Sequence, residues 1–203
     1  MITRREFVCS VGCCAAIAKN LSGQTANAPK DASKDASKKE GLVAPCGLYC
    51  GACAMYLATQ ENNPARLTSR FGSSPKQQSA KPPALTENMM CDGCGGGGRT
   101  PAHVPKCAIK LCAAEKTKTG RCADCAEFPC SRITEFNNDG MAHHSEVLGN
   151  LRQLREVGIK EWAKREEERW QCTKCQTKIA WYEAECIKCK TPRPSKLFPL
   201  SKA

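Results

Sequence analysis

Cysteine is the residue that most constrains how this chain can fold. Seventeen of the 203 residues are cysteines, whereas aromatic residues make up only 5% of the chain. A core with so little apolar bulk would be marginal on burial alone, and small cores of this kind rely on metals, disulfides or a partner. The cysteine content therefore predicts a protein that is held together by thiolate-bound metal ions.

Residues 1–18 have the pattern of an export signal. Residues 3–8 read TRREFV, which resembles the twin-arginine signal, and a weakly apolar stretch follows as far as an AIA sequence at 16–18, the form of a signal-peptidase site. We expect export by the twin-arginine route to the periplasm or cell surface. The alternatives are an ordinary basic N-terminus and a lipid anchor at Cys13; Ser10 disfavours the anchor, because a Leu-like residue is expected there.

The export route and the cysteine content support each other. Twin-arginine export moves proteins that are already folded, so thiols can receive their metal in the reducing cytoplasm. Fourteen cysteines remain once Cys9, Cys13 and Cys14 are removed with the signal, and in an oxidising compartment they would otherwise risk scrambled disulfides. No stretch approaches the roughly 20 apolar residues that a transmembrane span requires.

Composition divides the rest of the chain into segments. We expect a disordered linker at 19–42, where the DASK repeat at 31–38 has no apolar face. The other segments are a cysteine-rich metal-binding domain at 43–140 with a surface loop at 72–88 and a flexible glycine run at 95–98, a helix pair at 145–169, a small module at 170–192 and a tail at 193–203. Within the helix pair, Gly158 is the expected stop, Trp162 should point inward and Glu166 to Glu168 should face solvent.

The strongest local motif lies in the 170–192 module. Cys172 and Cys175 form one Cys-x-x-Cys pair, and Cys186 and Cys189 form another after a ten-residue spacer. Such pairs make knuckles that direct two sulfurs to one side, and two knuckles give tetrahedral sulfur coordination that suits zinc or a single iron. The module resembles a zinc ribbon and also the rubredoxin-type module at the end of rubrerythrins; disulfides or free thiols are the alternative.

Ten further cysteines occupy the segment between residues 46 and 130, more than scattered core thiols would explain. They fall into four motifs: PCGLYCGACAMY at 45–56, CDGC at 91–94, CAIKLCA at 107–113 and CADCAEFPC at 122–130. In this order the motifs resemble the bacterial and archaeal cysteine-rich family catalogued as domain of unknown function 3795, over about residues 43–140. The resemblance implies a metal-binding domain and carries no activity with it.

We expect these ten cysteines to bind metal in more than one site. One plausible four-sulfur site comprises Cys91, Cys94, Cys107 and Cys112. The remaining candidates for a second site are Cys46, Cys50, Cys53, Cys122, Cys125 and Cys130. His103 could replace a sulfur, although an isolated loop histidine is more often solvated, and His143 and His144 are expected to cap a helix or face solvent.

The spacing of the cysteines alone is compatible with either zinc or an iron–sulfur cluster. The paired cysteines followed by turns and the terminal ribbon favour zinc, two to three ions for fourteen thiols, with an iron–sulfur cluster or mononuclear iron as the alternative. The formal net charge of +11 suggests nucleic acid, but three tetrathiolate zinc sites would lower it to about +5. We therefore interpret the basic residues beside the cysteines mainly as compensation for thiolate charge. They are Lys106, Lys110, Arg121, Arg132, Lys174, Lys188 and Lys190.

The predicted fold is a small, irregular α+β, metal-stapled domain with a helix pair and a C-terminal zinc-ribbon-like β-hairpin module. Three histidines leave few general bases, and no Cys-x-x-Cys has the strand–helix setting of a thiol–disulfide enzyme. The sequence therefore favours a non-enzymatic scaffold that binds a protein partner over an iron-based electron carrier. Nothing in the pattern indicates an oligomeric state.

The export prediction depends on the two arginines. Replacing Arg4 and Arg5 by Lys keeps the charge but removes the pair that the twin-arginine route recognises, so full-length protein should remain in the cytoplasm. Cell fractionation and the mass of the intact chain measure this outcome. Export of the variant at the normal level would contradict the assignment.

Overall fold

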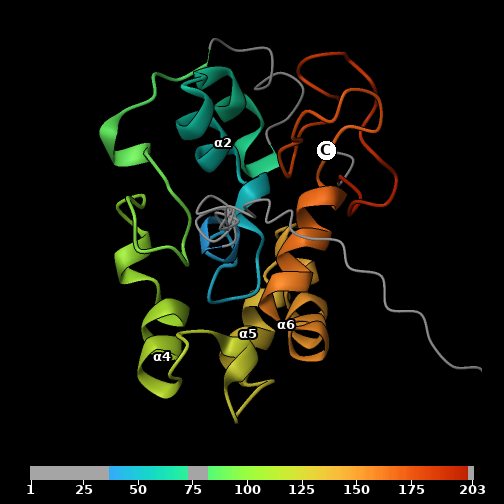
Figure 1. Ribbon diagram of the computed structural model, residues 1–203. Helices are drawn as coiled ribbons and strands as arrows, with labels where there is room; N and C mark the ends of the chain where they lie inside the picture. Colours follow the sequence, from blue (N-terminus) through green and yellow to red (C-terminus); the bar gives the residue numbers. More distant parts are fainter. Residues whose placement is uncertain (1–36, 73–81, 201–203) are drawn as a thin grey trace, which may run out of the picture.

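A computed structural model describes residues 37–72 and 82–200 (Figure 1). The export signal, Cys9, Cys13, Cys14 and most of the linker lie outside these residues, as does the middle of the 72–88 loop. Within the described ranges, no helix has both the length and the apolar character needed to cross a membrane.

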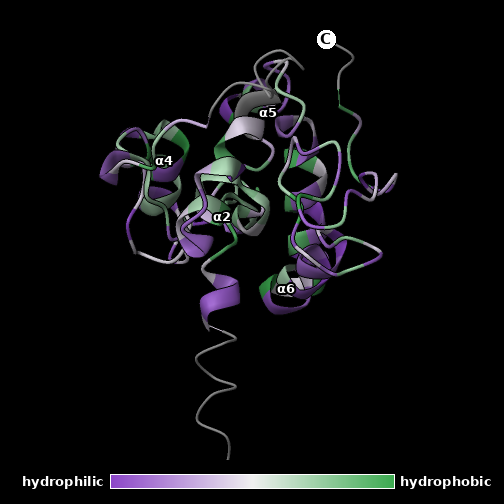
Figure 2. Ribbon diagram, turned by 90° about the horizontal axis from the view of Figure 1, so that it is seen from above, coloured by the Kyte–Doolittle hydropathy of each residue, from purple (hydrophilic) through white to green (hydrophobic). Residues whose placement is uncertain are grey.

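The described part of the chain consists of short helices, one longer helix and the loops that connect them. The α-helices are α2 (Ala54–Glu61), α4 (Ala108–Lys116), α5 (Ser131–Asn137) and α6 (Val147–Arg169). The 3-10 helices are η1 (Cys50–Ala52), η2 (Pro64–Gly72), η3 (Glu87–Met89), η4 (Val104–Lys106), η5 (Cys122–Asp124) and η6 (His144–Glu146). Figures 1 and 2 both place α4 and α6 on opposite sides of the molecule.

The expected β component does not form in the described residues. β-pairing there is limited to three isolated antiparallel bridges, Val43–Tyr49, Gln171–Lys178 and Glu185–Pro192. The predicted α+β class is therefore wrong in its β part, and the protein is mostly helical with a C-terminal four-cysteine cluster. Each C-terminal knuckle reverses the chain within a few residues of its single bridge, so the paired segments are too short to form a strand.

A cysteine stands immediately before three of the helices. Cys53 caps the N-terminus of α2, Cys107 that of α4 and Cys130 that of α5, each with extended backbone angles. The N-terminal end of a helix carries partial positive charge and favours a thiolate there. The starts of these helices are thus also the places where sulfur is held.

Helix α6 is divided at Gly158, whose φ of 77° and ψ of 164° are not helical. The break falls at the residue where the sequence predicted the first helix of the pair to end. Trp162 is fully buried, as predicted. Glu166 is only 5% exposed and accepts a hydrogen bond from Trp170 Nε1 at 3.0 Å, so the prediction of a solvated acidic run is wrong at this residue. The reason is the helical period, which places Glu166 one turn after Trp162 on the same inward face.

One apolar core runs through the cysteine-rich segment, α6 and the C-terminal module. Its aromatic contacts include Tyr49 against Trp162, with ring centroids 6.3 Å apart. The backbone N–H of Trp181 donates to the Ala52 carbonyl at 2.9 Å. Leu42 is 4% exposed and belongs to this core. Leu42 therefore packs with the core, whereas most of the linker predicted for 19–42 lies outside the described residues.

The glycine run is docked at its first residue. The Gly95 N–H donates to the Gly41 carbonyl at 3.2 Å, and a Cβ at Gly95 would lie 2.4 Å from the Val43 carbonyl oxygen. Only glycine allows the two backbones to approach this closely. Gly95 therefore attaches the CDGC loop to residues 41–43, which corrects the expectation of a flexible stretch at this position.

A buried arginine joins the C-terminal module to α2 and η2. Arg66 is 1% exposed and donates to Glu61 and Glu183, with all four nitrogen–oxygen distances at 2.8 Å. Glu183 also accepts the Ala180 N–H at 2.9 Å. The pair of Arg66 with Glu183 spans 117 residues of sequence, and both side chains are buried.

Replacing Arg66 by Ala should strongly destabilise the protein. The change leaves the Glu183 carboxylate buried without its partner, which costs about 3–5 kcal/mol for such pairs. The control is Arg165→Ala, which removes a pair with Glu161 whose arginine side chain is 55% exposed, and solvent screening makes that pair weak. Denaturant unfolding followed by tryptophan fluorescence compares the two variants, and equal shifts in midpoint would contradict a structural role for Arg66.

Candidate metal centres

The four C-terminal cysteines converge on one point. The sulfurs of Cys172, Cys175, Cys186 and Cys189 all lie within 4.8 Å of one another. The sulfurs of Cys172 and Cys189 are 3.5 Å apart, as are those of Cys175 and Cys186. A tetrahedral zinc with Zn–S bonds of about 2.3 Å separates its sulfurs by about 3.8 Å. The sulfur spacing therefore fits one tetrathiolate-bound ion.

Two copies of one backbone turn produce this arrangement. Residues 171–177 read QCTKCQT and residues 185–191 read ECIKCKT. In each copy the first cysteine N–H donates to the threonine carbonyl, at 2.9 Å in the first and 2.8 Å in the second. The residue before each threonine has positive φ, 58° at Gln176 and 59° at Lys190. The shared C-x-K-C-x-T pattern is a signal for this repeat that the motif analysis missed.

The threonine of each copy also contacts the sulfur of the second cysteine in that copy. Thr177 Oγ1 lies 3.2 Å from Cys175 Sγ, and Thr191 Oγ1 lies 3.2 Å from Cys189 Sγ. The Thr191 hydroxyl and backbone N–H hold the pKa of Cys189 at about 6, and Thr177 lowers the pKa of Cys175 in the same way. Because hydrogen bonds to sulfur favour its charged form, Cys175 and Cys189 are prepared to bind metal as thiolates.

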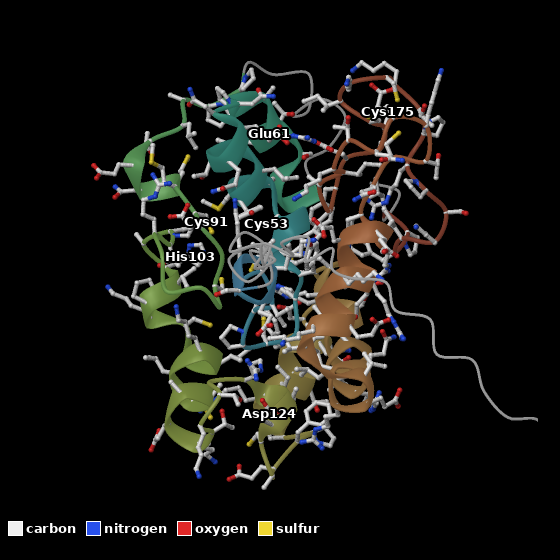
Figure 3. The ribbon with its side chains drawn as sticks, in the orientation of Figure 1. Cys53, Glu61, Cys91, His103, Asp124 and Cys175 are labelled. Carbon is white, nitrogen blue, oxygen red and sulfur yellow. The ribbon has the colours of Figure 1, made fainter. Side chains whose placement is uncertain are left out.

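The ten cysteines of the first segment are arranged differently. None of the fourteen cysteines in the described ranges forms a disulfide. In that part of the chain, no set of three potential ligands outside the C-terminal four has all its atoms within 4.8 Å. Figure 3 shows Cys53 and Cys91 on neighbouring segments, with Cys175 apart from them in the C-terminal module.

Four of the ten form an inner group, which we define as Cys50, Cys53, Cys91 and Cys94. The Cys94 N–H donates to Cys50 Sγ at 3.4 Å. Burial raises the pKa of Cys91 to about 12, and the neighbouring thiols of Cys53 and Cys94 add to the increase. The two pairs thus lie against each other, although 38 residues separate Cys53 from Cys91.

Five others form an outer group around Cys122. Burial raises the pKa of Cys122 to about 11, with further increases from the other four thiols of the group, Cys130, Cys112, Cys125 and Cys107. Two of them, Cys112 and Cys130, line an open surface pocket beside Lys116 and Arg132. This group is therefore accessible to solvent.

Cys46 lies between the two groups. Burial raises its pKa to about 12, and thiols of both groups contribute, Cys94 first and then Cys107 and Cys122. The grouping inferred from sequence, which joined the 91–94 pair to Cys107 and Cys112, stays a prediction. The contact of Gly95 with residues 41–43 instead favours pairing of the 91–94 loop with Cys50 and Cys53.

The C-terminal set of four ligands contains no histidine. His103 is exposed, as expected. His143 is instead 7% exposed, with Nδ1 at 2.7 Å from the Tyr182 hydroxyl and its ring stacked on Trp181 at 4.3 Å. Burial lowers the pKa of His143 to about 3, so the expectation of capping or solvent exposure is wrong for this residue.

A small cavity of about 40 Å³ lies beside His143. It is lined by residues of the cysteine-rich segment and the C-terminal module, among them Cys53, Ser69 and Trp181. The cavity has room for one or two waters and not for an organic substrate. It therefore marks the junction between the two parts and gives no evidence of a catalytic pocket.

Comparison with known proteins covers the first segment only. No curated protein and no solved structure matches the chain. Residues 42–135, which contain the inner group, the outer group and Cys46, match the family described as Protein of unknown function (DUF3795). The family resemblance predicted from the cysteine motifs is therefore confirmed over these residues.

Proposed function

We propose that this protein is an exported metal-binding protein in which the C-terminal cysteines hold one structural zinc ion. The observation that carries the proposal is the convergence of four sulfurs within 4.8 Å. Four thiolates complete a tetrahedron and leave no position for substrate, which is the arrangement of structural rather than catalytic zinc. A total of two to three zinc ions accords with the fourteen cysteines left after signal cleavage.

The metal would stabilise a region that shares the main core. Cys172 is 2% exposed and Cys186 is fully buried, and both pack with Trp170, Ile179 and Tyr182. Burial raises the pKa of Cys186 to about 11, so without a cation its thiolate would be unfavourable. Zinc supplies the compensating charge, and its binding free energy becomes folding free energy.

The biological role that we propose is non-enzymatic: a metal-stapled scaffold that binds a protein partner outside the cytoplasm. The twin-arginine pattern supports export, and the scarcity of general bases supports a scaffold over an enzyme. A rubredoxin-like electron carrier is the second candidate. It is favoured by the same four sulfurs and by the backbone and hydroxyl hydrogen bonds to them, since mononuclear iron accepts a tetrahedral thiolate site as zinc does.

Removing one C-terminal ligand should remove one metal. We expect Cys186→Ser to lower the metal content by about one equivalent per chain, because a structural tetrathiolate site needs all four ligands for full affinity. Thr173→Ala is the matched control, since Thr173 lies exposed in the same module and is not a ligand. Elemental analysis of both purified proteins provides the count; an unchanged metal content in Cys186→Ser would exclude a tetrathiolate site here.

Colour separates the two candidate functions. Zinc has a filled d shell and no redox change, so a zinc protein is colourless above the aromatic band, whereas iron–thiolate centres absorb visible light and bleach on reduction. We expect colourless protein with two to three zinc ions per chain when it is purified without oxygen. A coloured protein that carries stoichiometric iron and bleaches with dithionite would favour the electron carrier instead.

A further inference from the structure

We propose that the inner group, Cys50, Cys53, Cys91 and Cys94, forms a second metal centre that is separate from the outer group. The proposal rests on the proposed function in that it assumes metal binding by thiolates, but it uses none of the C-terminal residues. It assigns ligands to one site and predicts which of the ten family cysteines act together.

Two short turns present the sulfurs. The Cys53 N–H donates to the Cys50 carbonyl at 2.9 Å and closes η1, which separates the two cysteines by a single turn. Cys91 and Cys94 form the second pair with the same two-residue spacing. The Cys94 N–H then donates to Cys50 Sγ at 3.4 Å, which joins the two turns directly through a sulfur. The two Cys-x-x-Cys turns therefore lie side by side, with two cysteines contributed by each.

Both turns are fixed to the same framework. The Cys50 N–H donates to the Leu42 carbonyl at 2.7 Å, and the Gly95 N–H donates to the neighbouring Gly41 carbonyl at 3.2 Å. The Cys91 N–H donates to Thr59 Oγ1 at 2.9 Å, and Thr59 belongs to the helix that Cys53 begins. Three separate hydrogen bonds therefore hold the pairs together independently of any sulfur–sulfur bond.

The surroundings combine burial with devices that favour thiolates. Cys50 and Cys91 are each 4% exposed, and Cys53 stands at the positive end of α2. Several thiolates in so small a buried volume would be unstable without a cation, because unpaired buried charge carries a large desolvation cost. A thiophilic metal provides that cation.

The spacing of the group sets the kind of metal it can take. No three of its sulfurs lie within 4.8 Å of one another, in contrast to the C-terminal four. In a [4Fe–4S] cluster each thiolate binds a different iron, so the sulfurs stand farther apart than around one ion. The group therefore takes either such a cluster or a zinc ion reached by rotation of the side chains; both are thiolate centres, and elemental analysis distinguishes them.

Double variants test which cysteines share the centre. In the full chain purified without oxygen, we expect Cys50→Ser and Cys91→Ser to lose the same metal, and the double variant to lose no more than either single one. Cys107→Ser, in the outer group, should leave that metal bound, so Cys91→Ser combined with Cys107→Ser loses the sum of the two single effects. Zinc, iron and acid-labile sulfide per chain are measured in every protein.

The grouping of Cys91 with Cys107 would reverse these results and overturn the proposal. In that case Cys91→Ser with Cys107→Ser would lose no more than one of them alone, whereas Cys50→Ser with Cys91→Ser would lose two separate metals. Loss of no metal from either inner-group variant would overturn it equally, since the group would then consist of neutral core thiols.

A measurement on the unaltered protein covers variants that fail to fold. During stepwise metal withdrawal by a chelator, alkylation mapped by mass spectrometry should show Cys50, Cys53, Cys91 and Cys94 becoming reactive together with the release of one centre. Reaction of Cys91 and Cys94 in step with Cys107 and Cys112 would overturn the proposal. The C-terminal four are followed in the same sample, so failure of the inner centre and failure of the proposed C-terminal zinc are distinguished.

Discussion

The ion pair between Arg66 and its two carboxylates is the contact on which the relation between the two cysteine-bearing parts depends. A guanidinium that is 1% exposed is tolerated only when its donors are satisfied, and Glu61 and Glu183 satisfy it from opposite parts of the chain. This ion pair and the hydrogen bond from the backbone N–H of Trp181 to the Ala52 carbonyl hold the C-terminal module against η1, the turn that carries Cys50. The C-terminal sulfurs and the inner group are therefore parts of one packed body.

One continuous core unites this body, although the chain has few large apolar residues. Its core passes without interruption from Leu42 through α6 to Phe198, and the large buried side chains at its centre are Trp162 and Trp170. Away from this centre the short helices α2, α4 and α5 each start at a cysteine, so bound metal would fix their ends where apolar packing is thin. Apolar packing at the centre and metal binding at the helix starts together explain how helices of seven to nine residues can be stable parts of the fold.

The two sulfur arrangements differ in how they are built. The C-terminal knuckles close through hydrogen bonds within each seven-residue copy, so their geometry is local and the cysteines converge. The inner group depends on the hydrogen bonds from Gly95 to Gly41 and from Cys91 to Thr59, contacts that span 32 residues or more. A local site can be recognised from spacing, whereas a site made by docking cannot.

The sequence by itself determined the cysteine-built character of the protein, the C-terminal four-cysteine cluster, the family match over residues 42–135 and the break at Gly158, because each depends on residue types and their spacing along the chain. Tertiary structure alone decided the pairing of Cys50 with Cys94, the burial of His143 and Glu166, the close approach at Gly95 and the absence of strands from the described residues. These features follow from contacts between distant segments. Burial and docking depend on what the rest of the chain places beside a residue, and local pattern carries no information about that neighbour.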